Sequence, residues 1–270
     1  MQAKKSLGQN WLLSRSVAQK AVESARLTEA DTVIEIGPGK GFLTEFLLEK
    51  AGKVIAVEKD RELIQHLKER FTDEIMVGKL ALIEADIADY QLGHEVSKYK
   101  VVANIPYYLT GMIIRQFLEA ETQPELMVLM LQKEVADRLV ARDGKEGLLS
   151  ISVKVFGQPK LITKVPAKFF RPRPKVDSAL LLIDKISRQA LDTWCPLGHQ
   201  VSKFEQQFFK ILKQGFAHKR KLLKSNLNCS TELLAQVKIK PKARPENLTL
   251  DQWLHLTTLI IASKKPSIGS

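Results

Sequence analysis

Short apolar segments alternate with helical patterns along the first two thirds of the chain. Those at residues 32–36, 53–57, 80–86, 100–103 and 125–132 have the apolar, β-branched composition of buried strands. Residues 160–165 and 178–183 then predict a final antiparallel pair. This alternation predicts an α/β fold with a mostly parallel sheet and one antiparallel strand.

The pattern changes near Ile186. Beyond it only helical stretches remain, at residues 202–214, 219–227, 231–237 and 249–262. We therefore predict two domains, an α/β domain at residues 1–185 and a small all-α domain at residues 186–270. Residues 148–156 stay ambiguous, because their β-branched residues favour a strand whereas their length also permits a helix.

The charge of the chain follows this division. Residues 186–270 hold 14 Lys and Arg against 5 Asp and Glu, whereas residues 1–185 hold 28 against 25. A basic tail on a nearly neutral body favours a polyanion such as nucleic acid, with a merely soluble basic surface as the alternative. The cluster His218-Lys219-Arg220-Lys221 is expected at a helix start, where the helix dipole disfavours cations, so it indicates an anionic partner unless its lysines are simply solvated.

Composition excludes several other classes of protein. No apolar run approaches the roughly 20 residues of a membrane-spanning helix, and the first residues lack the apolar core of an export signal. Cys195 and Cys229 form neither a disulfide framework nor a metal cluster, which is typical of a reducing, cytoplasmic setting.

A glycine-rich turn, Gly37-Pro38-Gly39-Lys40-Gly41, joins the first strand to a helical pattern. Gly37 and Gly39 let the backbone approach a ligand, towards which helix amide groups point. The absence of Gly-Lys-Ser/Thr excludes a phosphate-binding P-loop. Alone, such a turn is a weak signal, since it can also be a plain tight turn.

Two acids end neighbouring strands. Glu58, 21 residues after Gly37, stands where an acid accepts hydrogen bonds from both hydroxyls of a ribose. Asp86 ends the third strand and could accept from the amino group of a bound adenine. The alternatives are a surface acid beside Lys59 for Glu58 and a cap of the following turn for Asp86.

Three further segments offer candidate contacts. Asn104-Ile105-Pro106-Tyr107-Tyr108 follows a strand at the edge where α/β sheets bind ligands, and its side chains suit a planar amino-purine. The proline-rich loop at residues 166–175 is stiff and can present an aromatic ring. The arm at residues 4–13 contains Gln9 and Asn10, which either tie it down or face a ligand, and the residues alone favour tying down.

Together these residues resemble the ribosomal RNA small-subunit adenine N6,N6-dimethyltransferases. The resemblance covers almost the whole chain and is carried by residues 7–12, 35–44, 58, 86, 104–107, 170–179 and 216–221. The combination of Asn-x-Pro-Tyr with Pro-x-Pro-Lys-Val-Asp-Ser is specific. The chain departs from the family pattern at Trp11, where Phe is usual.

The resemblance implies a class I S-adenosylmethionine-dependent methyltransferase fold with a seven-stranded sheet. It also implies a helix at residues 148–156 and an amino-terminal arm across the cofactor. The family's cofactor contacts fall on Asn10, Leu12, Gly37, Gly39, Glu58, Asp86 and Asn104. The aromatic positions that hold the target adenine fall on Tyr107 and Phe170. Because adenine N6 is a poor nucleophile, we assign the Asn104 side-chain oxygen and the Pro106 carbonyl as acceptors for its hydrogens, and we predict RNA contacts at Lys219, Arg220 and Lys221.

The implied activity is transfer of methyl groups to N6 of two adjacent adenosines near the 3′ end of small-subunit rRNA. The implied protein is a cytoplasmic monomer that acts on the small ribosomal subunit during its assembly, away from membranes. Three alternatives are a large-subunit resistance methyltransferase, a DNA adenine methyltransferase and a non-catalytic RNA-binding factor. The Pro-Lys-Val-Asp-Ser segment disfavours the first, Asn-Ile-Pro-Tyr the second, and the intact glycine turn with Glu58, Asp86 and Asn104 the third.

Overall fold

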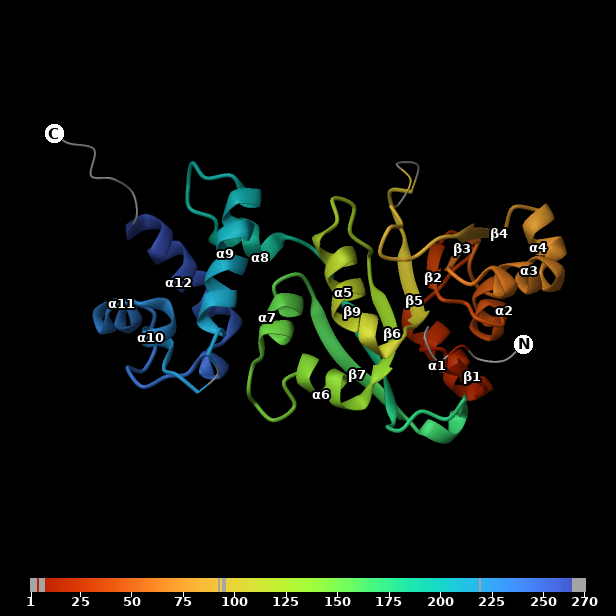
Figure 1. Ribbon diagram of the computed structural model, residues 1–270. Coiled ribbons are helices and arrows are strands. Elements are labelled where there is room, and N and C mark those ends of the chain that lie inside the picture. Colours follow the sequence, from red (N-terminus) through yellow and green to blue (C-terminus); the bar gives the residue numbers. More distant parts are fainter. Residues whose placement is uncertain (1–3, 5–7, 92, 94–95, 219, 264–270) are drawn as a thin grey trace. The chain divides into compact units, whose positions relative to one another are not determined.

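The computed structural model describes residues 4, 8–91, 93, 96–218 and 220–263 of the chain (Figure 1). The chain forms two compact units. The first unit comprises residues Met1–Asp137 and Gln158–Ile186, and the second comprises Arg138–Gly157 and Ser187–Ser270. The change near Ile186 thus coincides with a unit boundary, but residues 138–157 join the second unit although their sequence position suggested the first.

A seven-stranded sheet forms the centre of the first unit, with the strand order β4-β3-β2-β5-β6-β9-β7. Its strands are β2 (Thr32–Ile36), β3 (Lys53–Glu58), β4 (Leu80–Glu84), β5 (Lys100–Asn104), β6 (Met127–Gln132), β7 (Gln158–Val165) and β9 (Ser178–Asp184). β9 runs antiparallel to both of its neighbours, and the other pairs are parallel. The predicted mostly parallel sheet with one antiparallel strand is confirmed.

The strand order reverses between β2 and β5. From β2 the chain continues through β3 to β4 on one side, and β5 then pairs with the free edge of β2, with Ile36 opposite Ala103. The glycine turn after β2 therefore lies beside Asn104 at the end of β5. Open α/β sheets bind ligands in the crevice at such a reversal.

Helices cover the sheet and complete the core. They are α1 (Arg15–Ala25), α2 (Phe42–Leu48), α3 (Arg61–Arg70), α4 (Thr72–Met76), α5 (Thr110–Glu119) and α6 (Lys133–Leu139). One apolar cluster joins β-strand residues such as Val33, Val102 and Val128 to Ala21 of α1 and Phe46 of α2. Figure 1 shows α2, α3 and α4 on one side of β2 and β3.

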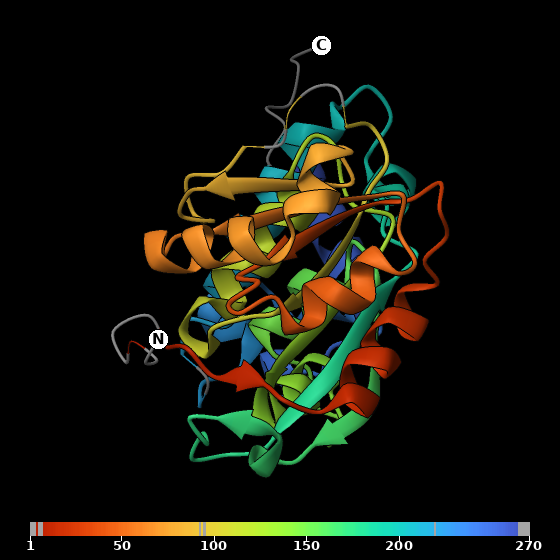
Figure 2. The ribbon, with the colours of Figure 1, turned by 90° about the vertical axis from the view of Figure 1, so that its right-hand side faces the viewer.

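A second, two-stranded sheet was not predicted. β1 (Trp11–Leu12) pairs antiparallel with β8 (Phe170–Arg171), and the N–H of Leu13 donates to the carbonyl of Phe169 at 2.8 Å. Figure 2 shows β1 next to the green segment that contains β8. This pairing joins the amino-terminal arm to the proline-rich loop.

The described part of the second unit is helical. It contains α7 (Leu148–Lys154), α8 (Gln189–Trp194), α9 (Val201–Gly215), α10 (Leu223–Leu227), α11 (Thr231–Gln236) and α12 (Leu250–Ser263). The ambiguous segment at 148–156 is therefore a helix, as the resemblance implied. Within the described residues, no helix is both long and apolar enough to span a membrane.

The expected helix start at the basic cluster is wrong. α10 begins only at Leu223, so His218, Arg220 and Lys221 lie in the connection between α9 and α10. The helix dipole therefore gives no argument for an anionic partner at this cluster. The helical pattern misled because Lys and Arg are good helix formers even where the backbone turns.

Candidate active site

The glycine turn lines the candidate site directly after β2. Gly37 and Gly39 have φ angles of +65° and +61°, which other residues rarely adopt. A Cβ atom on Gly39 would lie 2.9 Å from Cδ1 of Trp11, whereas one on Gly37 would meet no heavy atom within 4 Å. The turn therefore packs against the arm at Gly39 and is open to a ligand at Gly37.

The Glu58 carboxylate is buried at the end of β3, with 7% of the residue exposed. Its Oε2 accepts from the N–H of Gly39 at 3.2 Å, and its Oε1 accepts from the N–H of Asp60 at 2.9 Å. Burial raises the pKa of this carboxyl group above its usual value. The alternative of a surface acid beside Lys59 is therefore wrong.

Asp86 lies just beyond β4, and both of its carboxylate oxygens have partners. Oδ1 accepts from the N–H of Ala88 at 3.0 Å, and Oδ2 pairs with Nζ of Lys59 at 2.7 Å. The Lys59 ammonium holds the pKa of Asp86 below its usual range. Asp86 thus caps the following turn, as the alternative interpretation held, and it also lines a pocket with Glu58.

The orientation of the Asn104 side chain is set by the arm. Its Nδ2 donates to the carbonyl of Asn10 at 2.9 Å, which leaves Oδ1 as the acceptor for another group. The Pro106 carbonyl accepts from the N–H of Leu109 at 3.0 Å. No hydrogen bond within the described part of the chain reaches the Ile105 carbonyl, and Ile105 lines the same pocket. Ile105 therefore offers an acceptor that was not predicted from the sequence.

The Tyr107 hydroxyl is engaged within the protein. Its Oη lies 2.8 Å from Oγ of Ser178, which is fully buried at the start of β9. Burial raises the pKa of Tyr107. The ring of Tyr107, rather than its hydroxyl, is therefore left to meet a ligand, and the contact links the Asn-Ile-Pro-Tyr motif to the Pro-Lys-Val-Asp-Ser segment.

Two adjoining pockets lie at this edge of the sheet. The first pocket, of about 240 Å³, is lined by the arm and by Glu58, Asp86, Asn104 and Tyr107, among others. The second pocket, of about 780 Å³, is lined by Glu35, Lys40 and Arg171, among others. The two pockets share the lining residues Trp11, Gly37 and Asn104, so they are adjacent.

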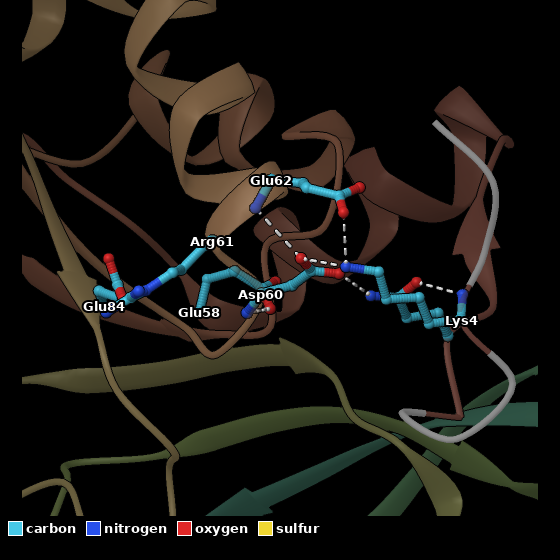
Figure 3. Close-up of polar contacts among 7 residues, drawn as sticks. Lys4, Glu58, Asp60, Arg61, Glu62 and Glu84 are labelled. Carbon is cyan, nitrogen blue, oxygen red and sulfur yellow. Dashed lines mark hydrogen bonds and ion pairs between the residues drawn. The ribbon is translucent and has the colours of Figure 1, made fainter.

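The amino-terminal arm is held against α3 by a polar latch, which we define as Lys4, Gln9 and Asp60. Nζ of Lys4 donates to Oδ1 of Asp60 at 2.8 Å and lies 3.2 Å from Oε1 of Glu62 (Figure 3). Nε2 of Gln9 donates to Oδ2 of Asp60 at 3.2 Å, and its Oε1 accepts from the N–H of Lys4. Gln9 thus ties the arm down, while the arm's Gly8, Gln9 and Asn10 line the first pocket.

Two buried polar atoms of the site have no hydrogen-bond partner among the residues that the structure describes. They are Nε1 of Trp11, a donor, and Oε2 of Glu35, an acceptor. Glu35 is 1% exposed in β2, and burial raises its pKa to about 8. No role was predicted for Glu35 from the sequence, although a lone acid inside an apolar strand was the available signal.

Asn10 and Leu12 belong to the arm, whereas Phe170 lies in the apolar core. The Asn10 side chain donates to the carbonyl of Gly8 at 3.1 Å, and Leu12, 3% exposed, lines the second pocket. Phe170 is also 3% exposed and belongs to the apolar core, and it lines neither of the two pockets. The structure therefore does not present the Phe170 ring to either pocket.

The basic cluster belongs to the second unit. Lys219 lies outside the described residues, whereas Arg220 and Lys221 are exposed. Nδ2 of the buried Asn226 donates to the carbonyls of Gly215 and His218, at 2.6 and 3.1 Å. The loop that carries the two exposed cations is therefore anchored at its beginning.

Comparison with known proteins agrees with this geometry. A family model described as "Ribosomal RNA adenine dimethylase" matches residues 1–262. A protein named ribosomal RNA small subunit methyltransferase A from Dehalococcoides mccartyi (strain ATCC BAA-2266 / KCTC 15142 / 195) is 41% identical over 265 residues, 94% of this chain and 87% of that protein. A protein of the same name from Synechococcus elongatus (strain ATCC 33912 / PCC 7942 / FACHB-805) is 37% identical, with 96% and 95% covered.

Solved structures share the fold. A dimethyladenosine transferase from Plasmodium falciparum is similar with a TM-score of 0.74 and 25% identity, over 94% of this chain and 98% of that one. The 23S rRNA methyltransferase ErmE has a TM-score of 0.73 and 23% identity, over 92% and 98%. The fold is that of class I S-adenosylmethionine-dependent methyltransferases, and the chain belongs to the ribosomal RNA adenine dimethylase family.

Proposed function

We propose that this protein transfers methyl groups from S-adenosylmethionine to N6 of two adjacent adenosines near the 3′ end of small-subunit rRNA. The observation that carries the proposal is the first pocket, where the Asn104 motif meets the glycine turn, Glu58 and Asp86. At Asn104 a donor of an activated methyl group can meet the amino group of an adenine. The product is N6,N6-dimethyladenosine.

The residues present fit S-adenosylmethionine, which supplies a methyl group already activated on a sulfonium. Glu58, fixed by two backbone N–H groups, would accept from the ribose hydroxyls, and Asp86 from the adenine amino group. Gly37 leaves open space beside the backbone. The unpartnered Oε2 of Glu35 would accept from the ammonium of the methionyl end.

The chain's own part in the chemistry is to present N6. The lone pair of adenine N6 is delocalised into the ring, so two acceptors aimed at the N6 hydrogens localise it and align it. Asn104 Oδ1 is one acceptor, because the arm engages its Nδ2. The sequence motif points to the Pro106 carbonyl as the second, but the Ile105 carbonyl is favoured, because that of Pro106 already accepts from Leu109. Positioning of this kind needs no strong general base, because N6 becomes acidic once it is methylated and then releases its proton.

Stacking holds the base. Tyr107 and Phe170 are the proposed stacking rings, and such contacts contribute about 1–3 kcal/mol per base. The adenine must leave its RNA stack to reach them. Since Phe170 is buried, its contribution accompanies a shift of the proline-rich loop.

We further propose that the second unit binds rRNA through Lys219, Arg220 and Lys221. The exposed cations on the anchored loop support this for Arg220 and Lys221. The partner is the small ribosomal subunit during its assembly, and the protein acts as a monomer in the cytoplasm, apart from membranes.

The decisive experiment offers the protein S-adenosylmethionine with unmodified small subunits, large subunits or naked rRNA. Digested nucleosides are then read by mass spectrometry. Dimethyladenosine from small subunits is expected, and its absence there would refute the proposal. Cofactor binding without any methyl transfer would instead favour a non-catalytic RNA-binding factor.

Asn104→Ala tests whether Asn104 holds N6. It should remove most turnover at saturating cofactor while rRNA binding, measured by filter retention, stays near that of the unmodified protein. Comparable turnover in the variant would show that Asn104 does not hold N6.

A further inference from the structure

Trp11 places a hydrogen-bond donor in the candidate site, and no acceptor in the described part of the chain binds it. Its Nε1 is buried and has no acceptor. Trp11 lines both pockets, and its five-membered ring packs over the backbone of Gly39. A buried N–H without an acceptor is unfavourable, so this arrangement favours a ligand that supplies one.

Lys40 adds a positive charge at the same place. Its Nζ lies 4.2 Å from the centre of the Trp11 ring. Among the residues that the structure describes, no carboxylate forms an ion pair with Lys40. An N–H donor and an unpaired ammonium beside one pocket form a site for an anion.

An unpaired acceptor lines the same pocket. Oε2 of Glu35 is buried without a partner, and Glu35 borders the second pocket together with Trp11 and Lys40. A free amino acid group carries one carboxylate and one ammonium. It therefore matches a pocket that offers cationic and N–H donors for the carboxylate and an acceptor for the ammonium. Gly37, which borders both pockets, leaves space for a ligand to pass between them.

We propose that Nε1 of Trp11 and the Lys40 ammonium bind the carboxylate of the methionyl end of the cofactor. The methionyl end then occupies the second pocket and the adenosine end the first. This inference rests on the cofactor placement proposed above. A Phe at position 11 would retain the packing on Gly39 but would lack the N–H.

The test compares two ligands without any RNA or turnover. S-adenosylhomocysteine carries the amino acid end, and 5′-methylthioadenosine lacks it. Calorimetry should show that Trp11→Phe weakens binding of S-adenosylhomocysteine about tenfold, because a hydrogen bond to a charged group is removed. Lys40→Met should weaken it similarly, whereas binding of 5′-methylthioadenosine should change less than about twofold in both variants.

Two matched variants control for the loss of an indole and of a surface charge. Trp194→Phe removes an indole from the second unit, and Lys53→Met removes an exposed lysine at the start of β3. Both should leave the two affinities unchanged. Circular dichroism melts of Trp11→Phe and Lys40→Met establish that each variant is folded.

Unchanged binding of S-adenosylhomocysteine by both Trp11→Phe and Lys40→Met would overturn the inference. Equal weakening of the two ligands would also overturn it, since the adenosine end would then be the part affected. Loss of rRNA binding with both affinities retained would assign Trp11 and Lys40 to the RNA instead. If the unmodified protein bound neither ligand, the proposed function itself would fail.

Discussion

Ser178 and Tyr107 stand 71 positions apart in the chain, and their hydroxyl oxygens lie 2.8 Å apart in the fold. Ser178 is fully buried and heads β9, next to the proline-rich loop. Its hydroxyl can therefore restrict the Tyr107 ring to one orientation beside Asn104. Under the proposed function Ser178 would be a positioning residue, since it would act on the base only through Tyr107.

We predict that Ser178→Ala and Tyr107→Phe each lower kcat/KM for rRNA by about threefold to tenfold, the effect of one hydrogen bond. The double variant should be no worse than either single one, because both remove the same hydrogen bond. Steady-state kinetics with the affinity for S-adenosylhomocysteine as a second readout would measure this. Additive effects would contradict it, and Ser150→Ala, a buried serine of the second unit, is the control.

Glu35 makes the free energy of unfolding depend on pH. Its pKa of about 8 exceeds the ordinary 4.5 because burial disfavours the carboxylate. Between these values the folded protein holds a proton that the unfolded chain has released. The free energy of unfolding therefore falls as pH rises from about 4.5 to about 8 and levels off above that.

We predict that Glu35→Gln removes this dependence, because the amide does not titrate. Urea unfolding of the cofactor-free protein at pH 5, 6.5 and 8 measures this. The free energy of unfolding of the unmodified protein should fall by at most about 1.4 kcal/mol per pH unit, and that of the variant should not fall in this way. The variant should accordingly be the more stable protein at pH 8. Glu49→Gln, an exposed acid near the end of α2, should behave like the unmodified protein.

At the scale of elements, the amino-terminal arm is held at three places. The latch of Lys4, Gln9 and Asp60 fixes its beginning, the Asn104 side chain holds the Asn10 carbonyl, and β1 pairs with β8. Between these places the arm lines the first pocket. A ligand in that pocket is therefore enclosed by a segment fixed on both sides.

We predict that Lys4→Met, which opens one end of the latch, speeds dissociation of S-adenosylhomocysteine several-fold. The reason is that the hydrogen bonds and ion pairs of Lys4 with described residues go to Asp60, Glu62 and Gln9, and that Lys4 does not line the first pocket. Stopped-flow fluorescence measures the rate, and the melting temperature should barely change because the pair is partly exposed. Lys20→Met, which removes the surface pair with Glu23, should leave the rate unaltered.

At the scale of the whole molecule, the sheet was predictable because each strand is an apolar segment of its own. Thr32–Ile36 and Lys100–Asn104 differ from their predicted ranges by one residue at most. The pairing of β1 with β8 was not predictable, since two residues carry no periodicity. The hydrogen bond of Ser178 with Tyr107 also depends on packing between distant segments, which local patterns do not encode, whereas the use of Gln9 as a tie was the interpretation that the residues alone favoured.

The charge of the second unit gives a prediction at the same scale. Replacing Arg220 and Lys221 by Ser should weaken rRNA binding and reduce its salt dependence. The slope of log binding constant against log salt concentration should become shallower by about 0.7–0.9 for each phosphate that the protein no longer neutralises. Lys50→Ser with Lys53→Ser removes the same charge from the first unit and serves as the control. Equal slopes for the unmodified protein and the Arg220/Lys221 variant would exclude this loop from the RNA interface.

Because β1 pairs with β8, the arm that lines the first pocket and the segment that carries Phe170 share one sheet. An RNA strand that holds the proline-rich loop in place thereby also holds the arm closed. With the cofactor in the proposed place, each transfer would leave S-adenosylhomocysteine beneath that arm, and this product could be exchanged only after the RNA had released the loop. Methylation would then be distributive, with partly methylated rRNA leaving between transfers and N6-monomethyladenosine accumulating before the dimethylated product.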